Sequence, residues 1–190
     1  MSYLKKNERY QQILNTAMQV VIDEGIAAIT ARKIAKTANI SVGLIHKHFK
    51  TIGELKSIAL IAITNQLIEQ QQTDLEHKTH IDKIIESVIP LKGNNAVIFR
   101  KMWNEALFLS DKDPDIKRAY QSSTNEWHEY IVQLINEAVA DNALQTNSAN
   151  DLAWRLIAIS CGFDNLSIID EFDQSTIYAH ILALLPPNLT

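Results

Sequence analysis

The stretch TARKIAKTANISVGLIHKHFKTIGEL, residues 30–55, decides the fold. It has the layout of two short helices joined by a tight turn, a helix-turn-helix, followed by the start of a third helix. Ala35 is small, as required where two helices cross closely, and Asn39 tolerates the left-handed backbone of a tight turn. Ser41 is placed to cap the second helix. That helix can therefore enter the major groove of DNA.

The segments on either side of this stretch predict two further helices. Apolar residues recur at helical spacing before it, at Ile13, Ala17, Val20 and Val21, and Gly25 can end that helix. At the other end, Thr51 and Glu54 form a capping box, which predicts a longer helix that runs to about Thr73. The longer helix would join the N-terminal helices to the rest of the chain.

Charge is divided unevenly along the chain. Residues 1–56 carry nine Lys and Arg against four Asp and Glu, a net charge of +5, whereas the other residues carry nine against eighteen, a net charge of −9. Arg32, Lys33, Lys36 and Lys47 fall inside the helix-turn-helix itself. Phosphates attract a basic N-terminal third and repel an acidic remainder, so this polarity favours a DNA-reading head on an acidic body.

Composition favours an all-α protein. The chain of 190 residues is 46% hydrophobic, Gly and Pro are few, and the alternation typical of strands is scarce. No apolar run is long enough to span a bilayer, and the N-terminus lacks an apolar signal core, so we expect a cytoplasmic location and no membrane partner. Cys161 is the only cysteine, and its apolar helical surroundings predict a buried thiol.

The remainder of the chain predicts further helices, over residues 81–88, 96–109, 114–141 and 152–169, with a last one before Pro186. Asp113-Pro114 is an N-cap followed by proline at the first helical position, which predicts the start of a long helix. Asp173 can cap the last helix.

Residues 9–55 resemble the DNA-binding domain of TetR-family transcriptional repressors. The family pattern is an amphipathic helix ending in Gly, then T-x-x-x-I-A, then S-x-G-x-[IL]-x-x-[HY]-F and a further helix. It is matched at Ile13, Ala17, Gly25, Thr30, Ile34, Ala35, Ala38, Ser41, Gly43, Ile45, His48, Phe49 and Leu55. The resemblance implies an N-terminal three-helix DNA-binding head, residues 1–50, and a C-terminal helical effector-binding and dimerisation body, residues 51–190.

The N-terminal part of the second helix of the motif is expected to meet the groove. The residues expected to contact DNA are Thr30, Arg32, Lys33, Thr37, Ser41, Val42, Leu44, His46, Lys47 and Lys50. Two positions depart from the family, which often has Tyr in place of His46 and Lys in place of Ile52, both of which usually touch phosphates. These departures put specific backbone contacts in doubt.

The last two helices carry apolar residues on more than one face, which favours an assembly surface. The residues expected there are Leu152, Leu156, Ile159, Phe163, Ile177, Ile181 and Leu185. The TetR resemblance implies a homodimer in which these helices form a four-helix bundle with their mates, so that two heads reach adjacent major grooves of a double-stranded operator roughly 34–36 Å apart. The alternative is that both faces are buried inside one monomer.

Aromatic side chains gather on two successive helices of the body. The residues expected to bind an effector are Phe99, Met102, Trp103, Glu105, Phe108, Tyr120, Trp127, Tyr130 and Asn165. Aromatic faces attract organic cations, and a carboxylate such as Glu105 strengthens the attraction, so we expect a small cationic or aromatic effector, with core packing as the alternative. The body also resembles, more loosely, Bet-type repressors, at Trp103, Ala106, Asp113, Pro114, Tyr120 and Trp127. The TetR resemblance implies that effector binding releases the operator.

Other functions stay open. The sequence lacks G-x-S-x-G, a phosphate loop and H-E-x-x-H, so we expect neither an enzyme nor a bound cofactor or metal. His77 and His80 could nevertheless share a helix face and hold a metal, which would make a metal-responsive regulator. The departures at His46 and Ile52 leave open a helical protein-interaction module with weakened DNA binding.

Overall fold

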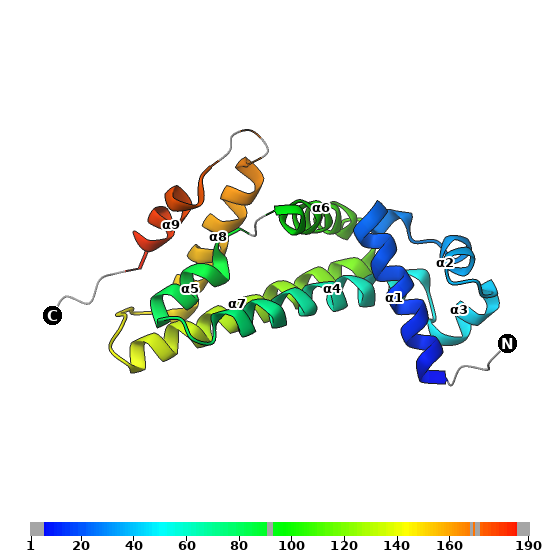
Figure 1. Ribbon diagram of the computed structural model, residues 1–190, viewed down its shortest axis with the longest axis horizontal. Coiled ribbons are helices and arrows are strands. Elements are labelled where there is room, and N and C mark those ends of the chain that lie inside the picture. The colour runs from blue at the N-terminus through cyan, green and yellow to red at the C-terminus, as the bar shows by residue number, and fades with distance from the viewer. Residues whose placement is uncertain (1–5, 91–92, 168, 170–171, 186–190) are drawn as a thin grey trace. The chain divides into compact units, whose positions relative to one another are not determined.

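The computed structural model describes residues 6–90, 93–167, 169 and 172–185, and these residues form helices and no strand, as expected (Figure 1). The chain divides into two compact units. One consists of Met1–Ile68 with Val97–Ser123, and the other of Glu69–Ala96 with Thr124–Thr190. Three helices contribute to both units, so this division differs from the boundary expected at residue 50.

The first unit contains the N-terminal helices and parts of three longer ones. In chain order these are α1 (Lys6–Glu24), the short 3₁₀ helix η1 (Ile26–Ala28), α2 (Ala31–Thr37), α3 (Val42–His48), α4 (Ile52–Leu75) as far as Ile68, α6 (Gly93–Ser110) from Val97, and α7 (Pro114–Ala140) as far as Ser123. Its core is continuous from Ile13 on α1 through Ile45 and Leu60 to Met102 and Ile116. The apolar stripe of α1 therefore belongs to the same core as residues of α3 and α6.

The longer helices begin at the caps that the sequence predicts. At α4, the Glu54 amide donates to Thr51 Oγ1 over 2.9 Å, and the helix ends at Leu75 rather than near Thr73. At α7, Asp113 Oδ1 accepts from the Asp115 and Ile116 amides, at 3.0 and 3.3 Å. Each cap satisfies amides that have no partner within the helix.

The second unit contains α5 (His80–Val88), α8 (Ala149–Leu166) and α9 (Gln174–Leu182), with the end of α4, the start of α6 and the rest of α7. Thr79 and Ser148 cap α5 and α8. Asp173 caps α9 as predicted, and hydrogen bonds from the Ser175 hydroxyl and from Thr176 lower its pKa to about 2. The cap is therefore ionised throughout the ordinary pH range.

The second core corrects the expected assembly surface. Of the seven apolar residues expected to face a second copy, Leu152, Leu156, Ile177, Ile181 and Leu185 are buried in this core. The other two, Ile159 and Phe163, are half-buried against the same core. A side chain buried within one chain has no surface left for a partner, so for the five buried residues the alternative of burial inside the monomer holds. Ile159 and Phe163 keep part of their surface exposed.

A different set of side chains on α8 and α9 faces solvent. Trp154, Leu166 and Leu182 are 45%, 48% and 42% exposed. Small exposed residues, Ala158 on α8 and Ala179 on α9, lie between them in the sequence.

Cys161 is exposed on α8, contrary to the expected buried thiol, although partial desolvation of its sulfur raises its pKa. No helix in the described part of the chain combines the length and hydropathy needed to cross a bilayer.

Candidate nucleic-acid interface

The corner between α1 and α2 is formed by Gly25 and η1. Gly25 has φ of +92°, a conformation that side-chain-bearing residues rarely adopt, and its amide donates to Val21 O over 2.9 Å. η1 then turns the chain toward α2, which begins at its N-cap Thr30. Thr30 Oγ1 accepts from the Lys33 amide over 3.2 Å, so Thr30 has a structural role within the head.

The turn between α2 and α3 has the geometry that the sequence predicts. Asn39 has φ of +53°, and the Ile40 amide donates to Ala35 O over 2.9 Å. Gln12 on α1 adds a contact that the sequence did not reveal, because its side-chain amide donates to Ala38 O over 3.1 Å. The turn is therefore held from outside as well as by its own backbone.

A packed platform supports α3 from the inside. Ile34, Ile45 and Phe49 are essentially fully buried, and the Phe49 ring stacks on Tyr10 with centroids 4.8 Å apart. This buried face fixes which side of α3 points outward, because a helix with one face packed can expose only the opposite one.

The outward side of α3 is polar and basic. Ser41, Val42, Gly43, His46, Lys47 and Lys50 are exposed, as are Thr30, Arg32 and Thr37 before them. Leu44 is half-buried, which leaves it less surface than expected of a base-contacting residue. Apart from the adjoining residues and the backbone of its own helix, no described atom lies within 4 Å of where a Cβ on Gly43 would stand, so packing within the chain does not require glycine there.

Lys33 and His48, near this surface, each interact with charged neighbours. Lys33 is half-buried and forms an ion pair with Glu24, so it would have to leave Glu24 to bind a phosphate. The pKa of His48 is lowered by desolvation and then by the positive charges of Lys6, Lys47 and Arg9. Three cations that act on one imidazole indicate a positive potential at the C-terminal end of α3.

One expectation about this region needs correction, and one departure from the family acquires a structural role. Among the described residues, Ser41 occupies the N-cap position of α3, but its side chain makes no capping hydrogen bond. Ile52, where the family often has a phosphate-binding Lys, is half-buried and packs against the first core. Ile52 therefore contributes to folding of the α4 start rather than to an outward charge.

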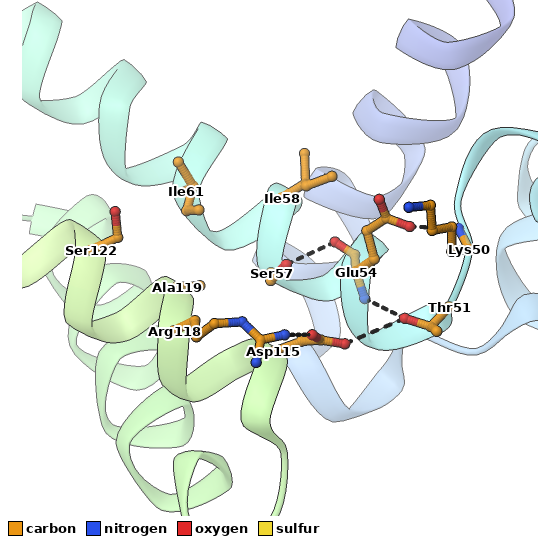
Figure 2. A pocket seen from close by; sticks show the side chains of 10 residues that line it. All are labelled: Lys50, Thr51, Glu54, Ser57, Ile58, Ile61, Asp115, Arg118, Ala119 and Ser122. Atoms are coloured by element: carbon orange, nitrogen blue, oxygen red, sulfur yellow. Dashed lines mark hydrogen bonds and ion pairs between the residues drawn. The ribbon is translucent and has the colours of Figure 1, made fainter.

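An open pocket of about 560 Å³ lies beside the start of α4 (Figure 2). Its walls combine the apolar side chains Ile58, Ile61 and Ala119 with charged ones. The charged side chains are Lys50, Glu54, Asp115 and Arg118. Asp115 on α7 forms an ion pair with Arg118 and accepts from Thr51 Oγ1 over 3.3 Å. None of the residues expected to bind an effector lines this pocket.

Three of the expected effector residues meet in the first unit. Trp103 makes edge-to-face contacts with Phe99 and with Tyr120, at centroid distances of 5.7 and 4.7 Å. All three are partly buried against the first core, and Met102 is 2% exposed within it. Phe99, Trp103 and Tyr120 therefore form an aromatic cluster, whereas Met102 is part of the buried core.

Two other expected effector residues of the first unit point elsewhere. Phe108 is 66% exposed, and the Lys112 Nζ lies 5.1 Å from its ring centroid. Both carboxylate oxygens of Glu105 accept hydrogen bonds from backbone amides, Oε2 from Ile26 over 2.7 Å and Oε1 from Ala27 over 2.8 Å. Glu105 is thus engaged with the α1–α2 corner instead of standing ready for a cation.

The remaining expected effector residues belong to the second unit. The Trp127 indole donates to Ser87 O over 3.0 Å, and the Asn165 side chain, which is exposed, donates to Cys161 O over 2.9 Å. Tyr130 is partly buried, which raises its pKa, and it lines a pocket of about 490 Å³ with Gln72, Thr73, Glu76, Lys83 and Gln133. Tyr130 thus lines a pocket, whereas Trp127 and Asn165 line neither this pocket nor the one beside α4.

The histidines considered for metal binding have no cluster around them. His80 Nε2 lies 2.7 Å from Asp141 Oδ2. In the described part of the chain, however, no three His, Cys, Asp or Glu side chains gather in a way that could hold an ion.

Residues 13–55 match the N-terminal domain of the bacterial regulatory proteins of the tetR family. The chain is 28% identical over 101 residues to the HTH-type transcriptional regulator PksA of Bacillus subtilis, covering 50% of this chain and 47% of that protein. It is 26% identical over 156 residues to the HTH-type transcriptional repressor KstR2 of Mycolicibacterium smegmatis, covering 78% and 74%. The matches to PksA and to a fatty acid metabolism regulator of Bacillus subtilis span less than half of those proteins.

Solved structures share the fold over most of the chain. A TetR transcription regulator from Haloarcula marismortui superposes with a TM-score of 0.77 at 12% identity, covering 95% of this chain and 100% of that one. A protein from Saccharomonospora viridis, described as a transcriptional regulator and solved in complex with choline, gives 0.73 at 20% identity, covering 94% and 95%. The multidrug binding protein EbrR, complexed with imidazole, gives 0.71 at 20% identity, covering 96% and 93%.

Proposed function

Because the chain carries the N-terminal domain of the tetR family of bacterial regulatory proteins, we propose that it is a ligand-responsive transcriptional repressor that binds a pseudo-palindromic operator as a homodimer. The observation that carries this proposal is the outward face of α3. It is exposed, polar and basic over a fully packed inner face, and it includes a glycine that internal packing does not require. A surface of this kind suits close approach to a phosphate backbone.

The contacts we assign to DNA follow from exposure. His46 and Lys47 are the side chains of α3 best able to donate hydrogen bonds, and Arg32, Thr37 and Lys50 lie exposed before and after it. Lys33 and Leu44 contribute less, because one is paired with Glu24 and the other is half-buried. Thr30 and Ser41 remain within reach of a phosphate at the starts of α2 and α3.

The operator proposal is tested by selecting bound duplexes from a pool of genomic fragments and then titrating salt against the selected sequence. We expect an enriched palindrome whose affinity falls steeply with salt, because each neutralised phosphate releases counterions. No enrichment at low salt would overturn the proposal. It would favour the second candidate, a protein-interaction module. The observation that favours this candidate is Ile52, an apolar side chain at a position where the family often has a phosphate-binding Lys.

For the homodimer we propose the solvent-facing sides of α8 and α9 in place of the buried residues. Trp154, Leu166 and Leu182 expose apolar surface that a second copy could cover, and Ala158 and Ala179 would let two helices approach closely. Sedimentation equilibrium tests this proposal, and a monomer at micromolar concentration would contradict it.

For the effector we propose a small organic cation or aromatic compound that contacts the aromatic cluster of Phe99, Trp103 and Tyr120. The edge-to-face geometry of Phe99, Trp103 and Tyr120 supports it, and choline and imidazole complexes of proteins with this fold add to that support. Because Glu105 is engaged elsewhere, cation–π attraction would have to supply most of the selectivity. Quenching of tryptophan fluorescence by a panel of cations, compared with the Trp103→Phe variant, tests this, and the absence of any saturable change would contradict it.

We further propose that the effector acts through a preference for one conformation of the body. A ligand that binds one conformation more tightly shifts the population toward it, and bound DNA must shift the same equilibrium in the opposite direction. Reciprocal weakening of operator and effector affinities is therefore expected.

A further inference from the structure

The Glu105 carboxylate joins α6 to the corner between α1 and α2, across 79 positions of sequence. Its two oxygens each accept one amide hydrogen, from Ile26 at 2.7 Å and from Ala27 at 2.8 Å. These amides open η1, so they have no partner within the helix, and the N-cap Gly25 has no side chain to supply one. Glu105 provides the cap from another helix.

Gly25 makes room for this contact. A Cβ on Gly25 would stand 2.6 Å from Glu105 Oε2, closer than carbon and oxygen can approach without a shift. The φ of +92° at the same residue also disfavours a side chain. The backbone conformation therefore favours glycine at this corner, and any side chain there would displace the Glu105 carboxylate from its present position.

Apolar packing accompanies the hydrogen bonds. Met102 and Ala106, on either side of Glu105 along α6, are buried in the same core as Val21 and Ile26. Apolar contacts are non-directional, whereas a carboxylate that accepts two neighbouring amides has a single favourable orientation. The carboxylate therefore determines the angle at which the corner sits on α6, and the apolar contacts supply most of the adhesion.

We propose that Glu105 is a positioning residue for two-headed DNA binding: its carboxylate fixes the orientation of the α1–α2 corner, and with it α2 and α3, on α6. The inference rests on the proposed function, because fixed orientation matters only where two heads must fit one operator. A rigid pair reaches both half-sites with a smaller entropic penalty, whereas loosely held heads must also be ordered on binding.

Each head also has apolar packing that does not involve the Glu105 carboxylate. Ile13, Ile34, Ile45 and Phe49 pack α1, α2 and α3 together without Glu105. Loss of the carboxylate should therefore leave each head able to bind half an operator, while the two heads lose their alignment.

The test compares Glu105→Gln with the wild-type dimer on two duplexes, the selected palindrome and a duplex in which one half-site is scrambled. Gln preserves size but keeps one acceptor oxygen, and its NH₂ group would face an amide donor. We expect the palindrome to bind about tenfold more weakly, because the pair of charge-assisted hydrogen bonds that orients each head is lost. We expect the half-site duplex to bind as before, because each head stays intact. Hydrogen exchange at the Ile26 and Ala27 amides should accelerate.

The matched control is Glu129→Gln, which removes the same charge from an exposed position of α7 and should change neither affinity. Unchanged affinity of Glu105→Gln for the palindrome would overturn the positioning role and leave the proposed function standing. Equal losses on both duplexes would also overturn it, since they would mean that the head itself is damaged. If the wild-type protein selects no duplex, the proposed function and this inference fail together.

Discussion

The outward face of α3 and the outward faces of α8 and α9 present different chemistry to solvent. On α3 the exposed side chains include His46 and Lys47, above a fully packed inner face. On α8 and α9 they include Trp154, Leu166 and Leu182, each more than two-fifths exposed. Exposed side chains of α3 include basic ones, whereas those of α8 and α9 include three large apolar ones.

This difference indicates two kinds of partner. A basic face remains hydrated until an anion replaces its counterions, so its binding weakens with salt. An apolar face gains free energy when another apolar face excludes water, and that gain depends little on salt. The two surfaces should therefore fail separately when each is altered, and the predictions below use that separation.

The largest effect is expected from removal of the platform under α3. Phe49→Ala deletes a buried ring that stacks on Tyr10, and should cost roughly 3–5 kcal/mol of unfolding free energy in the first unit. DNA binding should be lost, while α8 and α9 retain their own core and the dimer persists. Urea unfolding and sedimentation equilibrium would measure the two effects. Phe108→Ala, at a 66% exposed position, is the control and should cost less than about 0.5 kcal/mol.

A smaller effect is expected when a charge is placed on the apolar face. Leu182→Glu should weaken the dimer about a hundredfold, because two like charges would be buried near one another without partners. Binding to the palindrome should fall with it, and binding to a half-site duplex should not. Asn125→Glu, at an exposed position of α7, serves as the control in sedimentation experiments. A stable Leu182→Glu dimer would exclude this face as the interface.

The corresponding change on α3 should be milder. Lys47→Ala removes one exposed cation, so operator affinity should fall by roughly tenfold or less and the slope of log affinity against log salt by about one unit. The dimer should be unaffected. Lys101→Ala, at an exposed position of α6, should leave the slope unchanged. An unaltered slope for Lys47→Ala would mean that this side chain touches no phosphate.

The sequence predicted features that depend on residues close together in the chain. Gly25, Asp173 and Asn39 were identified because a helix end, a cap and a left-handed turn are decided within about four residues. Ser41 is the exception among them, since its residue type suits a cap but, in the described structure, its side chain does not form one.

Features that depend on distant packing could not be predicted in the same way. Apolar residues cover several faces of α8 and α9, so periodicity could not decide which face is buried, and the buried Leu156 and Ile181 were assigned to the wrong side. Glu105 likewise was assigned to an effector because nothing near it in sequence announces the Ile26 amide. A long-range hydrogen bond has no local signature.

The smallest effects on stability should come from a matched pair of glycines, one on each outward face. Gly43 on α3 and Gly162 on α8 both lie within helices. Apart from adjoining residues and the backbone of the same helix, no described atom lies within 4 Å of a Cβ built on either. Alanine at either position should therefore raise the unfolding free energy by about 0.5–1 kcal/mol through helix propensity.

The two alanine variants should nevertheless weaken different interactions. Gly43→Ala should reduce operator affinity and leave the dimer intact, if the missing side chain makes space for the DNA backbone. Gly162→Ala should weaken the dimer and leave half-site binding unchanged, if α8 approaches its mate closely beside Cys161. Thermal unfolding, sedimentation and duplex titration of both variants would decide this. A gain in stability with no loss of either interaction would mean that the glycines serve neither interface, and the partner of each outward face would then be decided by the Lys47 and Leu182 variants alone.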